Sequence, residues 1–202
     1  MKPEFSVVIR GVFRGQRDYF HSTDLYDELV GALYDRGVEV TSLDIKIKQK
    51  ITSVPQVDFF RDELDDANTQ AAAFAKFKSK SGTWLAVVSQ GVEPITNRKP
   101  YNEAPVWGKI TRNDAQFELT DCHSYSPIEI VTATAVHAHK TLLPPPVGER
   151  WLLAQIMADR LLGNTELEFF KIDIARRLGP KMTQSNMYDK TGIFGKMIFI
   201  LK

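Results

Sequence analysis

The chain has a single cysteine, Cys122, among its 202 residues. One cysteine excludes an intramolecular disulfide and is typical of a reducing compartment. No apolar run approaches the roughly 20 residues that a membrane-spanning helix needs. The opening segment MKPEFSVVIRG lacks the long apolar region of a secretory signal peptide. We therefore expect a cytoplasmic protein that does not enter a membrane.

Net charge is also nearly absent. The 26 basic and 25 acidic residues leave a formal charge of +1, whereas nucleic-acid and anionic-membrane partners require a concentrated basic surface. The sequence contains no phosphate-binding glycine loop. His137 and His139 can bind one ion from the same strand face, but no third ligand stands at a suitable spacing. We expect no nucleic acid, no metal and no cofactor.

The first half of the chain predicts a strand, a helix and further strands. Ser22 or Thr23 can cap the helix, and Gly37 can end it. The following segment alternates apolar and polar residues, which is typical of a half-buried strand. The predicted elements are a strand at 5–13, a helix at 21–37, a strand at 38–51, a hairpin at 71–91 turning at Ser81 and Gly82, and a linker at 93–104.

The second half predicts the same order of elements. Shifting the sequence by 127 residues lays the alternating segment 43–51 on 170–178 and Leu25 on Leu152. Such a match can arise by chance in any chain of this kind, but a duplicated unit explains both spacings. The predicted elements are strands at 106–111, 115–121 and 128–136, a helix at 149–162 closed by Gly163, and strands at 167–178 and 191–202.

Each half contains one predicted strand, one long apolar helix and a run of hairpin-linked strands. This order predicts an α+β protein with mainly antiparallel sheets. This order resembles the hot-dog fold. The resemblance implies a tandem double hot dog, in which two antiparallel sheets each wrap one long central helix. The two units would span residues 1–93 and 104–202 and pack together as one globular body.

A histidine motif strengthens the resemblance. In hot-dog β-hydroxyacyl-carrier-protein dehydratases, eight residues separate a histidine from the glycine that starts the central helix. Here KTLLPPPV separates His139 from Gly148. The dehydratases carry a carboxylate five residues after that glycine, where this chain has Leu153. The tandem arrangement is also similar to the AfsA-type family of bacterial signalling-molecule biosynthesis.

The resemblance implies a site shared between units, where the histidine of one unit meets the helix of the other. His139 would be the acid/base, and Asp27 or Glu28 the carboxylate that the second unit lacks. Complementing the helix dipole is the alternative explanation for both carboxylates, and the one that their place at the start of the helix favours. The alternative for His139 is a satisfied core histidine. A Cys122–His123 dyad is disfavoured, because adjacent residues of a strand point to opposite faces. The residues expected around the substrate are Gly148, His137, Tyr26 and Trp151.

These residues predict an enzyme that processes an acyl thioester carried on coenzyme A or on phosphopantetheine. The reaction would be dehydration or hydration, AfsA-type condensation, or hydrolysis. An acyl carrier protein is the expected macromolecular partner, and a homodimer is left open. The alternative is a non-catalytic protein that binds an acyl ligand or a partner and has lost the helix acid, as Leu153 indicates.

Overall fold

The computed structural model describes residues 2–61, 70–120, 125–162 and 169–202. It divides into two compact units, Met1–Tyr101 and Asn102–Lys202, and each is described by itself. No helix among the described residues combines the length and apolarity needed to cross a bilayer. The predicted dyad of Cys122 and His123 and the predicted helix end at Gly163 lie outside the described residues.

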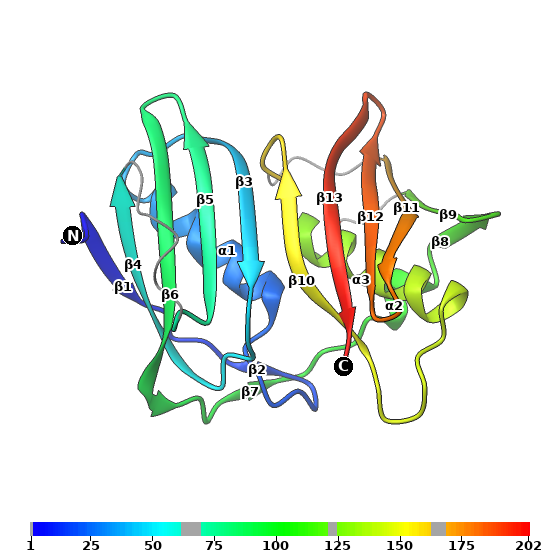
Figure 1. The fold of residues 1–202 in the computed structure, drawn as a ribbon, viewed down its shortest axis with the longest axis horizontal. Coiled ribbons are helices and arrows are strands. Elements are labelled where there is room, and N and C mark those ends of the chain that lie inside the picture. The colour runs from blue at the N-terminus through cyan, green and yellow to red at the C-terminus, as the bar shows by residue number, and fades with distance from the viewer. Residues whose placement is uncertain (1, 62–69, 121–124, 163–168) are drawn as a thin grey trace. The chain divides into compact units, whose positions relative to one another are not determined.

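The first unit contains one long helix and an antiparallel sheet (Figure 1). The strand order in the sheet is β1-β4-β6-β5-β3, and β2 and β7 form a separate short parallel pair. Its elements are β1 Phe5–Val8, β2 Phe13–Arg14, α1 Ser22–Tyr34, β3 Val40–Ile47, β4 Ser53–Arg61, β5 Ala73–Ser79, β6 Gly82–Pro94 and β7 Arg98–Lys99.

The predicted first helix is confirmed as α1. Leu25, Leu29 and Leu33 recur every four residues and are completely or almost completely buried, so one face of the helix packs into the core. The N-cap is His21 rather than Ser22 or Thr23, since its ring accepts a hydrogen bond from the Thr23 backbone N–H. Figure 1 shows this helix lying across the back of β3, β5 and β6.

The second unit repeats the combination of one long helix and one antiparallel sheet. The strand order is β8-β9-β11-β12-β13-β10, so β11, β12 and β13 follow one another as a meander. In the second unit β12 lies beside β11 and β13 lies beside β10. In the first unit the last strand, β6, lies beside β4, and β5 lies beside β3, so the last two strands occupy the opposite places in the sheet. The elements are α2 Ala104–Trp107, β8 Ile110–Asn113, β9 Gln116–Thr120, α3 Pro127–Leu142, β10 Trp151–Ala158, β11 Phe169–Gly179, β12 Met182–Asp189 and β13 Gly192–Leu201.

The second half corrects three predictions. Val106 and Trp107, predicted as part of a strand at 106–111, belong to the helix α2, and the strand β8 begins at Ile110. Residues 128–136, predicted as a strand, belong to the helix α3, and residues 149–162, predicted as a helix, contain the strand β10. The 127-residue shift is therefore wrong, because it lays α1 on a strand. The structure matches α1 with α3, and β3 with β10, in the order of elements.

A local signal marks the start of α3. The Ser126 hydroxyl accepts a hydrogen bond from the Glu129 backbone N–H, while the Glu129 carboxylate accepts one from the Ser126 N–H. This capping box, with Pro127 as the first helical residue, is a recognised helix start. Both units thus place one helix against an antiparallel sheet.

Candidate functional site

His139 lies in the last turn of α3 and is 0% exposed. Its Nδ1 lies 2.7 Å from the Ala135 carbonyl oxygen, and its Nε2 lies 2.7 Å from the Thr183 hydroxyl oxygen. The rings of Trp151 and Phe199 pack on it, with centroids 5.0 and 4.4 Å away. The imidazole is therefore enclosed by the core of the second unit.

The two hydrogen bonds fix the protonation of this ring. A carbonyl oxygen can only accept, so Nδ1 carries the proton and donates to Ala135. Nε2 then accepts from the Thr183 hydroxyl, which lies on β12. Burial lowers the pKa of His139 to about 4, against a small opposing effect of the Ala135 hydrogen bond. The ring is neutral near pH 7 and ties α3 to β12.

Replacing Thr183 with valine should destabilise the protein by about 1–3 kcal/mol, because the shape is kept while the buried Nε2 loses its donor. Ser185 of the same strand offers a matched contrast. Its hydroxyl is buried and has no hydrogen-bond partner among the described residues, so Ser185→Ala should be neutral or stabilising. Urea unfolding measures both changes, and equal costs would contradict the assigned role of Thr183.

A cavity of about 220 Å³ lies beside this histidine, at the C-terminal end of α3. Leu142 and Leu143 at the end of the helix form part of its wall, and Trp151 of β10 and Leu201 of β13 form another part. Thr183, the hydrogen-bond partner of His139, also lines it. The lining of the cavity is therefore both apolar and polar, and its polar part includes Thr183.

Two loops border this cavity. The Trp151 indole N–H donates to the Leu143 carbonyl oxygen at 2.8 Å, which holds the segment after α3 against β10. Lys181, in the turn between β11 and β12, donates to a Glu149 carboxylate oxygen at 2.9 Å. These contacts connect the loop before β10 with the β11–β12 turn at the cavity.

Gly148 does not begin a helix, which corrects the prediction. It lies in an exposed turn before β10, with a φ of 84°, in the region that favours glycine. The eight-residue spacing from His139 therefore crosses from the end of a helix to a turn before a strand, not from a strand to a helix. The motif match is coincidental in structure, and no helix N-terminus is present at Gly148 to polarise a carbonyl group.

His137 lies two positions before His139 in the sequence but on a different face of α3. Its ring packs near Trp107 and Phe117, with centroids 5.6 and 5.8 Å away. Burial and the charge of Lys140 lower its pKa. The Lys140 ammonium lies over the Trp107 ring. His137 therefore belongs to an aromatic cluster and does not line the cavity.

The predicted carboxylate turn belongs to α1 in the first unit. Tyr26 is buried in the core, whereas Asp27 and Glu28 are exposed. Burial, followed by the charge of Asp24, raises the pKa of the Glu28 carboxyl. Because His139 belongs to the other unit, its pairing with Asp27 or Glu28 stays a prediction.

A charged cluster at the start of α1 was not predicted. Arg14 is 3% exposed, and its guanidinium forms two hydrogen bonds to the Asp24 carboxylate, one of them 2.7 Å long from Nε. Lys99 reaches the same carboxylate at 3.2 Å, and Arg14 and Arg17 lie over the Tyr101 ring. No local spacing in the sequence indicates that β2, α1 and β7 bring these residues together.

Electrostatics in this cluster keep its ionisable groups in defined states. Burial would raise the pKa of the Asp24 carboxyl, but the hydrogen bonds and charges of Arg14 and Lys99 hold it below its usual value. Burial, and then the charges of Arg17 and Arg14, lower the pKa of His21 to about 3. Within the part of the chain that the structure describes, no three His, Cys, Asp or Glu side chains form a metal-binding group.

No family model and no curated protein matches the sequence. Solved structures with a similar fold include an acyl-ACP thioesterase from Bacteroides thetaiotaomicron, with 11% identity and a TM-score of 0.49 over 98% of this chain and 96% of that chain. A trans-AT PKS dehydratase domain from Brevibacillus brevis has 9% identity and a TM-score of 0.44 over 100% and 96% of the two chains.

A conserved protein of unknown function with a hot dog fold from Alicyclobacillus acidocaldarius has 9% identity and a TM-score of 0.47, over 91% of this chain and 87% of that chain. At these identities and TM-scores, the similarities say nothing about what this chain binds or catalyses. Its function has to be inferred from its own residues.

Proposed function

We propose that this chain binds acyl thioesters and holds the acyl group in the cavity at the end of α3. The observation that carries the proposal is the wall formed by Leu142, Leu201 and Trp151, because each buried methylene of a ligand contributes about 0.8 kcal/mol. The volume of about 220 Å³ is below the roughly 300–1,000 Å³ of sites for drug-sized ligands. A short acyl group therefore fits best.

The resemblance to the hot-dog fold supports the choice of an acyl thioester as ligand. The acyl group would be carried on coenzyme A or on the phosphopantetheine of an acyl carrier protein, in the cytoplasm. The chain itself would need no cofactor for this role. Its own residues would bury the acyl chain and exclude water from it.

Processing of the thioester requires a group that takes up and delivers a proton. His139 is neutral, enclosed and hydrogen-bonded at both ring nitrogens. This environment favours the binding function over dehydration, AfsA-type condensation or hydrolysis. Catalysis by His139 with Asp27 or Glu28 remains the second candidate, and it would require this ring to release Thr183.

Turnover assays separate the two candidates. The purified chain is incubated with short 3-hydroxyacyl, enoyl and saturated acyl thioesters of coenzyme A, and product formation is measured alongside binding. Binding without turnover supports the binding function. Turnover that is lost in a folded His139→Gln variant supports catalysis, and turnover that this variant keeps removes His139 from the mechanism.

Filling the cavity should abolish much of the binding. Leu142→Trp places an indole at the cavity wall, and we expect the affinity for butyryl-coenzyme A to fall at least about tenfold, equivalent to ~1.4 kcal/mol. Leu178→Trp makes the same change on β11 at an exposed leucine that does not line the cavity. Isothermal titration calorimetry of both variants tests the proposal, which fails if they bind equally well.

A further inference from the structure

Among the described residues that line the cavity, Arg177 is the one with a positively charged side chain. It lies on β11 directly opposite Thr183 of β12, and both residues line the cavity. Side chains of directly opposed residues project from the same face of a sheet, and Thr183 projects toward α3, where it meets His139. Arg177 therefore also projects to the helix side. Thr183 is buried and Arg177 is exposed, which places the guanidinium at the open end.

Among the described residues, the Arg177 side chain makes no hydrogen bond and no ion pair. Its neighbours differ in this respect: Arg176 donates to the Gln184 side-chain oxygen, and Lys181 donates to Glu149. No aspartate or glutamate is among the described residues that line the cavity. The cavity thus has apolar side chains such as Leu142 and Leu201 in its wall, and one positive charge at its mouth that no carboxylate among the described residues neutralises.

We infer that Arg177 makes this cavity a binding site for short-chain carboxylates. The aliphatic chain would lie against Leu142 and Leu201, and the carboxylate would pair with the guanidinium at the mouth. The planar guanidinium matches a carboxylate with two parallel hydrogen bonds. The inference rests on the proposed function only in using the same cavity, since a free acid is a different ligand from a thioester.

A phosphate monoester presents the same kind of oxyanion, so the experiment compares the two. The full chain is titrated with butyrate, butyl phosphate and the neutral isostere butyramide. Binding is followed through the indole N–H signal of Trp151 in 15N-labelled protein, because this group donates to Leu143 at the cavity wall. We expect butyrate to bind more tightly than both other ligands.

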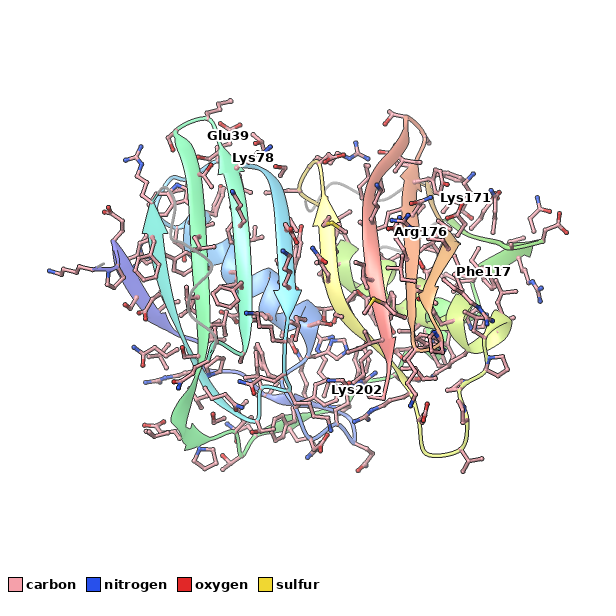
Figure 2. All side chains as sticks on the ribbon, viewed as in Figure 1. Glu39, Lys78, Phe117, Lys171, Arg176 and Lys202 are labelled. Carbon is pink, nitrogen blue, oxygen red and sulfur yellow. The ribbon has the colours of Figure 1, made fainter. Side chains whose placement is uncertain are left out.

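The matched variants are Arg177→Gln and Arg176→Gln, which remove neighbouring charges from β11. Figure 2 labels Arg176. Arg177→Gln should weaken butyrate binding about tenfold, or ~1.4 kcal/mol, and leave butyramide binding unchanged. Arg176→Gln should alter neither, because Arg176 does not line the cavity.

Equal losses in the two variants, butyramide binding as tightly as butyrate, or butyl phosphate binding more tightly than butyrate would each overturn the inference. Binding of butyrate without binding of butyryl-coenzyme A would support the inference and refute the proposed function. Binding of butyryl-coenzyme A alone would do the reverse, and binding of neither ligand would refute both.

Discussion

The free energy of unfolding should fall by several kcal/mol as the pH is lowered from about 7 to about 4, because two histidines are buried in neutral form. The folded-state pKa is about 4 for His139 and about 3 for His21, against 6.5 for an ordinary histidine. Between pH 6.5 and these values the unfolded chain binds more protons than the folded chain. Stability is therefore complete above pH 6.5 and is lost below it, with His139 contributing on the order of 3 kcal/mol.

Urea unfolding at a series of pH values measures this loss. The Asp24 carboxyl, whose pKa is lowered, stays ionised in this range. Glu28, whose pKa is raised, opposes the trend only weakly because it is exposed. His139→Phe should remove the His139 share of the pH dependence and leave that of His21, whereas His137→Gln on the half-buried side of α3 should retain most of the dependence. An unchanged slope in His139→Phe would refute the assignment.

Replacing Asp24 with alanine should destabilise the protein by about 3–5 kcal/mol, because it removes the carboxylate that pairs with the buried Arg14 guanidinium. Arg14 is 3% exposed and forms two hydrogen bonds to this carboxylate. Lys99 also loses its contact with Asp24. The favourable position of an acidic residue in the first turn of α1 is lost as well.

The matched control is Asp27→Ala, which removes an exposed carboxylate from the same helix and should cost less than about 1 kcal/mol. A double variant, Arg14→Met with Asp24→Leu, should recover much of the lost stability, since apolar replacement of a whole buried pair is often neutral. The free energy of unfolding of the three variants, measured by chemical denaturation, tests this prediction. Similar costs for Asp24→Ala and Asp27→Ala would show that Arg14 is solvated without its partner.

The regular elements that the sequence predicted correctly have strong local periodicity. In α1, leucines recur at four-residue spacing on one buried face. In β3, Leu43 and Ile45 are buried, while Thr41 and Lys46 are exposed. A helix or strand with one solvent-exposed face shows a periodic pattern of apolar and polar residues in its own sequence. Strands β4 and β12 were not predicted.

Intrinsic secondary-structure propensities explain why the helix and the strand of the second half were predicted the wrong way round. The α3 segment IEIVTATAV is rich in β-branched residues, and the β10 segment WLLAQIMA is rich in helix formers. Both segments are buried on more than one side. Neither therefore has a single solvent-exposed face whose polar residues would reveal a helical or a strand periodicity. Pairing with β13 decides for β10, and the Ser126–Glu129 capping box decides for α3.

The sequence by itself determined the low net charge, the α+β composition and the one-sided helix and strand of the first unit, because composition and periodicity are local properties. It also identified His139 as a residue of interest, without its surroundings. Only the tertiary structure decided that this ring is sealed by Ala135 and Thr183 and that Arg177 faces a cavity. Strand pairing and burial join residues that are distant along the chain, and their free energies exceed propensity differences of about 1 kcal/mol per residue.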